Sequence, residues 1–356
     1  MDFSLFFFAD SAADGDRYSL LLRSARYADA NGFSAVWTPE RHFHSFGGQY
    51  PNPAVVGAAL AIATHRLAIR AGSVVAPLHH PIRIAEEWSV VDNLSGGRAG
   101  VSFASGWHPD DFVLRPQSFA DRKKTMAEAI DQVRRLWRGE EVEFPDLDGK
   151  PQAVRILPAP VQPELPFWIT AAGSPETFRL AGTLGAGVLT HQLGQSRDVL
   201  ARNIATYRAA LAAAHGTGAR GHVAVMLHTM IGTDRDRVRE VVRGPMSEYL
   251  SGSVDLIARD PASAELGKLS PENKAFLVAR SFDRYFESAG LFGTVDDGVA
   301  TARGLAAIGV DEIACLIDFG VAQPEVLGAL EHLGEVRGAF AEARGAFAEE
   351  RVGEAL

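Results

Sequence analysis

The amino-acid sequence predicts a single (β/α)₈ barrel domain over all 356 residues. Eight short apolar runs alternate with longer helical stretches, and most of these runs are almost continuously apolar. Continuous runs are typical of parallel strands buried on both faces, and eight of them separated by helices favour a closed barrel. An open, doubly wound sheet is the alternative. The expected strands are Phe3 to Phe8, Ala35 to Trp37, Leu67 to Val75, Ala99 to Phe103, Phe167 to Thr170, Gly187 to Thr190, Val223 to Ile231 and Glu312 to Ile317.

The helical stretches and two long connections complete the pattern. A helix is expected from about Arg17 to Ala30, because Asn31-Gly32 is a good helix stop, and another from about Asp121 to Arg138. Insertions are expected after the fourth strand, from Ser105 to Pro166, and after the seventh, from Gly244 to Gly293. The second insertion holds few periodic apolar residues and several helix breakers, so we expect a lid or a helical excursion near the site.

Composition and charge exclude several classes of protein. Apolar residues make up 47% of the chain, and the net charge of −9 with a pI of about 5.7 argues against nucleic-acid or anionic-membrane partners. The apolar runs are too short to span a bilayer and the first residues lack the basic start of a signal peptide, so a cytoplasmic protein is expected. The single cysteine, Cys315, is expected to be a packed, inert thiol. A seven-residue repeat in the tail places Phe340 and Phe347 on one helix face, over the barrel or over a partner subunit of a homodimer.

Polar side chains gather directly after the expected strands, where barrel enzymes place their working residues. Seven of the 11 histidines fall at these positions, and each of them either contacts a ligand or is structural. They are His42, His44, His79, His80, His108, His191 and His228. No metal signature is present, because His42 and His44 lack a partnered carboxylate motif, although a zinc hydrolase remains an alternative.

The segment after the fifth strand has the composition of an anion-binding helix start. Gly173 permits a tight turn, Ser174 is a good N-cap, Pro175 suits the first helical position, and Thr177 lies three residues beyond the cap. A helix that begins here points free N–H groups and its positive dipole end at the site, which favours a phosphate. An ordinary capped helix is the alternative.

Three motifs resemble those of the bacterial luciferase-like flavin monooxygenases, and the similarity runs from about Met1 to Ala339. Glu40-Arg41-His42-Phe43 with Asn52-Pro53 resembles the Glu-His-His-Phe and Asn-Pro stretch of the luciferase α-chain. The run from Ala76 to Glu86 is similar to the family's third-strand exit, and Asp92 to Arg98 matches its Asp-x-x-Ser-x-Gly-Arg signature. Two further traits resemble the MupA-like branch of natural-product assembly. They are Trp37 to Phe43 and Leu189 to Gln195.

The resemblance implies that FMN lies over the barrel mouth, is supplied in reduced form by a separate flavin reductase, and uses O₂ to oxygenate an organic substrate, free or carrier-bound. It assigns the phosphate to Ser174, Thr177 and Arg122, and it implies a non-proline cis peptide within Ala71 to Val74. The other expected flavin contacts are Ser73, Trp107, Gly173 and His191. The expected catalytic residues are His42 and His228, which would handle protons, and Asp111, which would hold the loop or tune the site.

Departures from the family pattern narrow the chemistry. Arg41 stands where luciferase has its catalytic histidine, Ala104 replaces the reactive cysteine, and Ser105 replaces a second phosphate arginine, which argues against light emission. Met226 replaces the sulfonate-binding arginine of the alkanesulfonate monooxygenases, which argues against a sulfonate substrate. A deazaflavin (F420) oxidoreductase on the same fold and a non-catalytic, flavin-storing relative are the alternatives.

Overall fold

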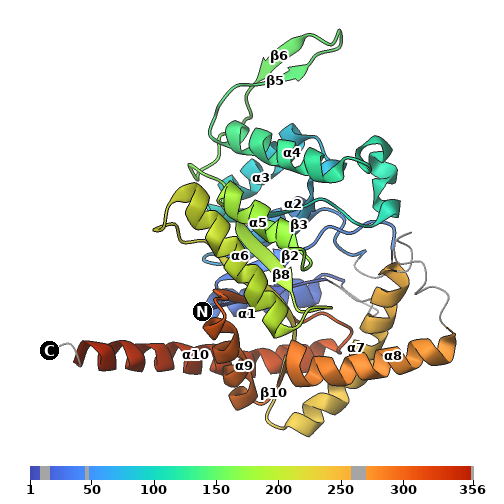
Figure 1. Ribbon diagram of the computed structural model, residues 1–356, viewed down its shortest axis with the longest axis vertical. Coiled ribbons are helices and arrows are strands. Elements are labelled where there is room, and N and C mark those ends of the chain that lie inside the picture. The colour runs from blue at the N-terminus through green and yellow to red at the C-terminus, as the bar shows by residue number, and fades with distance from the viewer. Residues whose placement is uncertain (9–16, 45–47, 258–269, 354–356) are drawn as a thin grey trace.

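Eight parallel strands close into a barrel in the computed structural model, which describes residues 1–8, 17–44, 48–257 and 270–353 (Figure 1). Each strand pairs with its neighbour along the chain, and the first pairs with the last, so the sheet has no open edge within the barrel. The predicted barrel is therefore confirmed against the open sheet. The barrel strands are β1 (Asp2–Phe6), β2 (Ala35–Thr38), β3 (Ala68–Val75), β4 (Ala99–Ala104), β7 (Phe167–Ala171), β8 (Gly187–His191), β9 (Val223–Ile231) and β11 (Glu312–Leu316).

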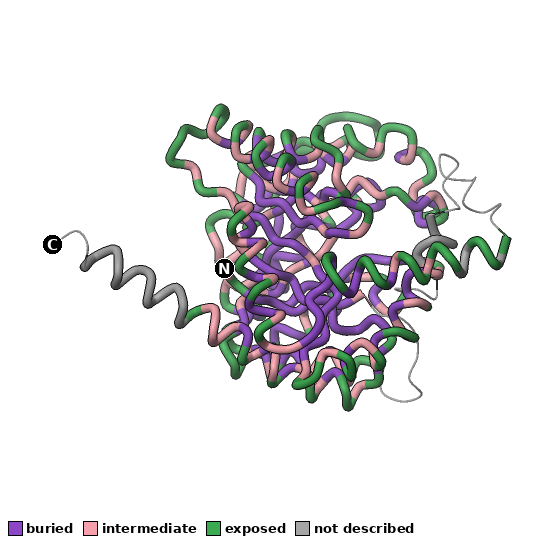
Figure 2. The backbone as a smooth tube through the Cα atoms, turned by 60° about the horizontal axis from the view of Figure 1, so that its bottom comes forward, coloured by how far each residue is buried: buried purple, intermediate pink, exposed green. Residues whose placement is uncertain are grey.

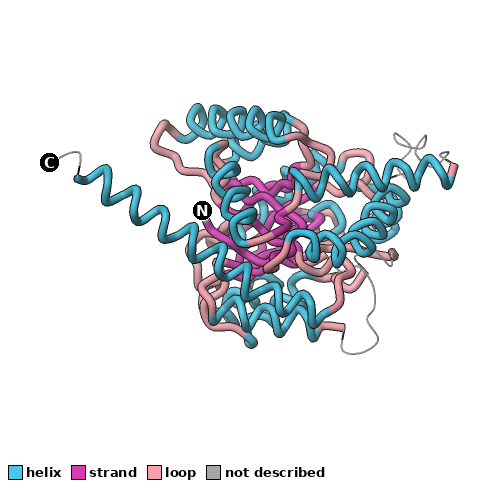
Figure 3. The backbone as a smooth tube through the Cα atoms, turned by 90° about the horizontal axis from the view of Figure 1, so that it is seen from below, coloured by secondary structure: helices cyan, strands magenta, loops and turns pink. Residues whose placement is uncertain are grey.

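Helices surround the strands, as Figure 3 shows from below, and the buried residues concentrate between the two layers (Figure 2). Asn52 begins one helix by accepting hydrogen bonds from the N–H groups of Ala54 and Val55 at 2.9 and 3.1 Å, and Gly96 ends another in the left-handed conformation. The helices are α1 (Ser19–Ala30), α2 (Pro53–Ala63), α3 (Pro81–Ser95), α4 (Arg122–Trp137), α5 (Pro175–Leu184), α6 (Arg197–His215), α7 (Arg235–Ile257), α8 (Pro271–Arg284), α9 (Val295–Ala307) and α10 (Gln323–Gly353). No helix in this described part of the chain combines the length and hydropathy that a membrane span needs.

The insertion after β4 contains a hairpin that the sequence analysis missed. Strands β5 (Val142–Pro145) and β6 (Pro151–Val154) pair antiparallel and project beyond the helices (Figure 1). Asp146 fixes the turn by accepting hydrogen bonds from the N–H groups of Asp148 and Lys150, both at 2.8 Å, and Gly149 adopts a φ of 78°. The strands are short and mostly exposed, so no apolar run marks them.

The insertion after β9 is helical where it is described, and its first helix, α7, begins at Arg235, before the expected start at Gly244. Helix α7 runs through Gly244 and Pro245 without a break at either residue. It buries an apolar stripe that the sequence analysis overlooked, formed by Val238, Val242, Met246, Tyr249 and Leu250. Packing of this stripe against the barrel outweighs the helix-breaking tendency of Gly and Pro. The central part of the expected lid, residues 258–269, lies outside the described residues.

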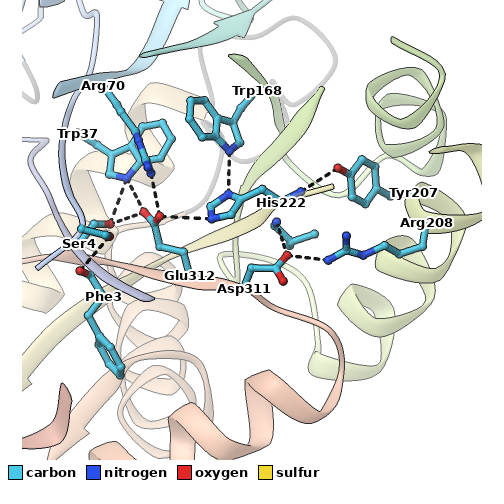
Figure 4. A network of polar contacts seen from close by, with 12 residues as sticks. Phe3, Ser4, Trp37, Arg70, Trp168, Tyr207, Arg208, His222, Asp311 and Glu312 are labelled. Atoms are coloured by element: carbon cyan, nitrogen blue, oxygen red, sulfur yellow. Dashed lines mark hydrogen bonds and ion pairs between the residues drawn. The ribbon is translucent and has the colours of Figure 1, made fainter. Parts of the chain in front are cut away.

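A buried charge network fills the amino-terminal half of the barrel (Figure 4). Oε1 of Glu312 accepts hydrogen bonds from Ser4 and Trp37 at 2.5 and 2.8 Å, and Oε2 lies 2.8 Å from Nη1 of Arg70. Burial would raise the pKa of Glu312, but the attraction of Arg70 holds it below its usual value. Because this network occupies the barrel interior at one end, the opposite end is the place for a ligand.

The carboxyl-terminal helix closes the lower end of the barrel. Phe340 of α10 packs edge-to-face on Phe3 with 6.2 Å between ring centroids. Phe340 therefore covers the barrel, which is one of the two positions expected for it. The side chain of Phe347 lies outside the described residues. A hollow of about 350 Å³ beside Phe340 also opens at this end, away from the carboxyl ends of the strands. Cys315 is buried, and burial raises the pKa of its thiol to about 12, which makes it the inert thiol that was expected.

Candidate active site

A continuous cluster of rings and cations lies at the carboxyl ends of the strands. His228 of β9 contacts the ring of Tyr249 from α7 with centroids 4.3 Å apart, and Tyr249 in turn contacts Phe8, just after β1, at 6.1 Å. The guanidinium of Arg41, just after β2, lies 5.3 Å from the rings of both Phe8 and Trp107. Five segments of the chain thus meet at the barrel mouth.

Glu40 connects the loops after β2 and β3, although the sequence analysis gave it no role. Its Oε1 lies 2.9 Å from Nε2 of His42 and 2.6 Å from Nε2 of His79, while its Oε2 accepts the N–H of Val75 at 2.7 Å. Burial would raise the pKa of Glu40, but these hydrogen bonds hold it below its usual value. Burial would lower the pKa of His79, but the bond to Glu40 keeps it above its usual value. The contact therefore favours the charged form of each partner.

His228 is a neutral imidazole with an unused nitrogen. Its side chain is buried among the rings of Tyr249, Tyr285 and Phe319, and its Nε2 has no hydrogen-bond partner among the described residues. Burial, reinforced by the nearby His191, lowers the pKa of His228 to about 3. The expected proton exchange through an imidazolium near neutral pH does not fit this value, whereas hydrogen bonding through Nε2 does.

The loop after β4 brings Asp111 beside a second buried histidine. Nδ1 of His108 lies 3.3 Å from Oδ1 of Asp111, and both side chains are buried. Trp107, the preceding residue, stays 41% exposed, so one ring of the mouth faces outward. This contact links Asp111 to the loop after β4, and its expected role stays a prediction.

The exit of β8 is held by internal hydrogen bonds. The N–H of Leu193 donates to Nδ1 of His191 at 3.1 Å, so a neutral His191 carries its proton on Nε2. Burial lowers the pKa of His191 to about 4, which keeps it neutral at physiological pH. The amide of Gln195 donates to Thr190 at 3.1 Å and to the carbonyl of His191. A rigid, neutral Nε2–H donor results.

The expected phosphate cradle stays a prediction: Ser174 lies at the N-cap position of α5, but its side chain makes no capping hydrogen bond. Its hydroxyl instead donates to the carboxylate of Glu176 at 2.7 Å, so an anionic group already lies at this helix start. This hydrogen bond lowers the pKa of Glu176, and the cations Arg179 and Lys123 contribute in the same direction. Gly173 adopts a φ of 128°, and a Cβ there would meet only Gln195 at 3.5 Å. The helix start therefore has space beside Gly173, while the carboxylate of Glu176 offsets part of the attraction of its N–H groups for another anion.

Arg122, at the first position of α4, is tied to the neighbouring loop. Its Nε donates to the carbonyl of Gly106 at 3.1 Å and its Nη1 to that of Phe119 at 3.1 Å. Gly106 has a φ of 73°, and a Cβ there would lie 2.8 Å from Val75 and 2.9 Å from Phe112. Arg122 therefore braces the loop that carries Trp107.

The expected non-proline cis peptide is confirmed between Gly72 and Ser73 in β3. Gly72 packs so tightly that a Cβ would lie 2.7 Å from the ring of Phe6, which explains why glycine stands there. The half-buried Ser73 follows it, before the strand reaches Val75, whose N–H is bound by Glu40.

Several buried polar atoms at this end have no partner among the described residues, and each unpaired group costs about 1–3 kcal/mol. Such atoms concentrate where a polar ligand completes a site. They are Thr38 Oγ1, Arg41 Nε, His108 Nε2, Gln192 Oε1 and His228 Nε2.

The luciferase-like monooxygenase family matches residues 1–312. The chain belongs to that family. It is 24% identical, over 96% of each chain, to the oxygenase component of the flavin-dependent trigonelline monooxygenase of Acinetobacter baylyi. It is 25% identical to the monooxygenase RslO1 of Streptomyces bottropensis, with a TM-score of 0.75 over 94% of this chain and 98% of that one. An F420-dependent secondary alcohol dehydrogenase shares the fold at 17% identity, with a TM-score of 0.73 over 95% of this chain and 98% of that one.

Sequence reasoning placed most of this luciferase-like site but missed three of its members. Glu40 and Arg41 were named only as part of a family motif. A charged residue directly after a barrel strand was itself a signal of a functional side chain. Tyr249 reaches the site from α7, and only the overlooked apolar stripe of that helix would have revealed it.

Proposed function

We propose that this luciferase-like enzyme is a two-component monooxygenase that takes reduced FMN from a separate reductase and uses O₂ to oxygenate an organic substrate. The observation that carries the proposal is the set of unpaired, buried polar atoms around the mouth of a barrel of this family. Its similarity to a protein named as an oxygenase component supports the reductase partner. When bound, FMN would supply the electrons that activate oxygen.

The described residues fit FMN in three places. The start of α5, with Ser174 and Thr177, would bind the phosphate, because helix N–H groups point there and the cations Arg179 and Lys123 act on the same place. Arg122 is proposed to contribute to the phosphate as well. Gly173 leaves room for it. The remaining proposed contacts of the flavin are Ser73, Trp107 and His191.

Three residues would act on the substrate side. His42 holds or moves a proton at its ring, with Glu40 fixing its orientation at 2.9 Å. His228 would place its neutral Nε2 toward the reacting atoms, and the surrounding rings exclude water from it. Asp111 orients His108 and with it the loop after β4.

The decisive experiment compares the two cofactors that this fold accommodates. Reduced FMN mixed with the protein should be bound, and its oxidation by dissolved O₂ should differ in rate from that of free reduced FMN. F420 incubated with a secondary alcohol should stay oxidised. F420 reduction by the alcohol, with no effect of the protein on reduced FMN, would replace the monooxygenase with the dehydrogenase alternative.

The phosphate cradle is tested by separating FMN from riboflavin, which lacks the phosphate. Ser174→Ala with Thr177→Ala should weaken FMN binding by about 1–3 kcal/mol, because each change removes a hydrogen bond to a charged group. Riboflavin affinity should not change. Equal FMN affinity of variant and parent would rule out this cradle.

A homodimer is proposed through α2 and α3, which pack side by side. Their outer faces expose Val55 and Ile62 on α2 and Val90 and Leu94 on α3, a concentration of apolar side chains that is typical of subunit contacts. Ile62→Glu should convert the dimer to a monomer in analytical ultracentrifugation, while Ile62→Val should not.

The finer assignment to the MupA-like, natural-product branch also stays a proposal, supported by the motifs at Trp37 to Phe43 and Leu189 to Gln195.

A further inference from the structure

Arg41 is a buried cation without a counter-ion. The side chain is only 7% exposed, and its Nε is buried with no acceptor. Among the described residues no carboxylate forms an ion pair with it, and no side-chain hydrogen bond is made. A charge taken out of water without a hydrogen-bonded partner is strongly unfavourable, so proteins keep such groups where a ligand completes them.

The described surroundings of Arg41 are aromatic and give its Nε no acceptor. The guanidinium carbon lies 5.3 Å from the ring centroids of both Phe8 and Trp107, and aromatic rings attract a cation without supplying the oxygen acceptors that its N–H groups require. Asp111, the carboxylate with the largest effect on Arg41, is engaged with His108 at 3.3 Å. Burial lowers the pKa of Arg41, but a guanidinium stays protonated in proteins, so the positive charge persists.

We propose that Arg41 binds a carboxylate of the organic substrate through its in-plane N–H groups, next to the reacting end of the barrel. This inference rests on the proposed monooxygenase function and adds the charge class of the substrate. A planar carboxylate matches the fork of N–H donors on a guanidinium. The phosphate of the flavin, the other source of an anion, already has its own helix start at Ser174.

The test measures binding of benzoate and the uncharged benzamide to the FMN-loaded enzyme, by isothermal titration calorimetry. The parent should prefer benzoate by about tenfold or more. Arg41→Met should remove that preference, Arg41→Lys should retain part of it, and the exposed control Arg23→Gln should keep all of it. Equal affinity of the parent for both probes, or no benzoate binding, would overturn the proposal.

Two further measurements separate the remaining explanations. FMN and riboflavin should bind Arg41→Met as they bind the parent, and a loss confined to FMN would assign Arg41 to the phosphate and overturn the proposal. The melting temperature of Arg41→Met should equal or exceed that of the parent, because an uncompensated buried charge is removed. A lower melting temperature with an unchanged benzoate preference would make Arg41 structural.

Failure of the monooxygenase function is distinct from failure of this proposal. It would abolish the protein's effect on reduced FMN without altering the benzoate preference.

Discussion

Oε1 of Glu40 lies 2.6 Å from Nε2 of His79 and 2.9 Å from Nε2 of His42. One fully buried oxygen therefore joins the exits of two neighbouring strands and orients the histidine that we assign to proton handling. Because Glu40 also accepts the N–H of Val75, its charge is satisfied from three directions, and the lowered pKa follows from that geometry.

Replacing Glu40 with Gln should destabilise the protein in a pH-dependent way. The lowered pKa of Glu40 contributes stability above its unfolded value of about 4.5, which is lost as the pH falls through the folded value. The raised pKa of His79 contributes stability below its unfolded value of about 6.5, which is lost as the pH rises through the folded value.

Urea denaturation of the parent and Glu40→Gln should therefore differ by roughly 1–3 kcal/mol between those two unfolded values. The difference should shrink on either side of that window. A difference that is constant across pH would show that Glu40 acts through packing alone.

The buried pair of Arg70 and Glu312 makes a second stability prediction. Arg70→Leu leaves the carboxylate of Glu312 buried without its 2.8 Å partner, so the free energy of unfolding should fall by roughly 3–5 kcal/mol. Arg83→Leu, whose parent side chain is 63% exposed, should change it by less than about 0.5 kcal/mol. Urea denaturation near neutral pH measures both, and similar values for the two variants would mean that the network of Figure 4 contributes nothing specific.

Gly106→Ala should disturb the loop that carries Trp107. The φ of 73° strains any side chain, and the new Cβ would also lie 2.8 Å from Val75, so a loss of about 2–4 kcal/mol is expected. Gly149→Ala is the matched control, because its φ is 78° but nothing lies within 4 Å of the new Cβ, so only the backbone cost of about 1–2 kcal/mol remains. FMN affinity should fall in the first variant alone, and equal effects would remove the loop from the flavin site.

The barrel was predictable from the sequence because its strands are buried on both faces and leave continuous apolar runs. Several strand exits were predictable for the same reason, since a run such as Gly187 to Thr190 is followed directly by a polar residue, here His191. The hairpin β5–β6 left no such mark, and only the Asp146-to-Gly149 turn pointed to it.

The electrostatic character of the site could not be predicted in the same way. The pKa of His228 depends on Tyr249, Tyr285 and Phe319, which come from three later elements, so no local pattern identifies its neutral state. Glu40 meets His79 only because β2 and β3 are adjacent in the barrel, and the lack of an ion pair between Arg41 and the described carboxylates likewise depends on tertiary placement.

The last prediction concerns the neutral histidine of β9. His228→Phe keeps the ring cluster but removes Nε2, so the protein should stay folded. Reduced FMN bound to the variant in air should release hydrogen peroxide faster, because the hydrogen-bonding nitrogen that would hold the oxygen species at the site is gone. With a pKa of about 3, His228 stays neutral at ordinary pH, so the ratio of peroxide release in variant and parent should be constant between about pH 5 and about pH 9. His65→Gln, whose parent side chain is 88% exposed, is the control and should match the parent. A ratio that changes with a midpoint near the ordinary histidine value would show that His228 titrates and that proton transfer, rather than neutral hydrogen bonding, is its role.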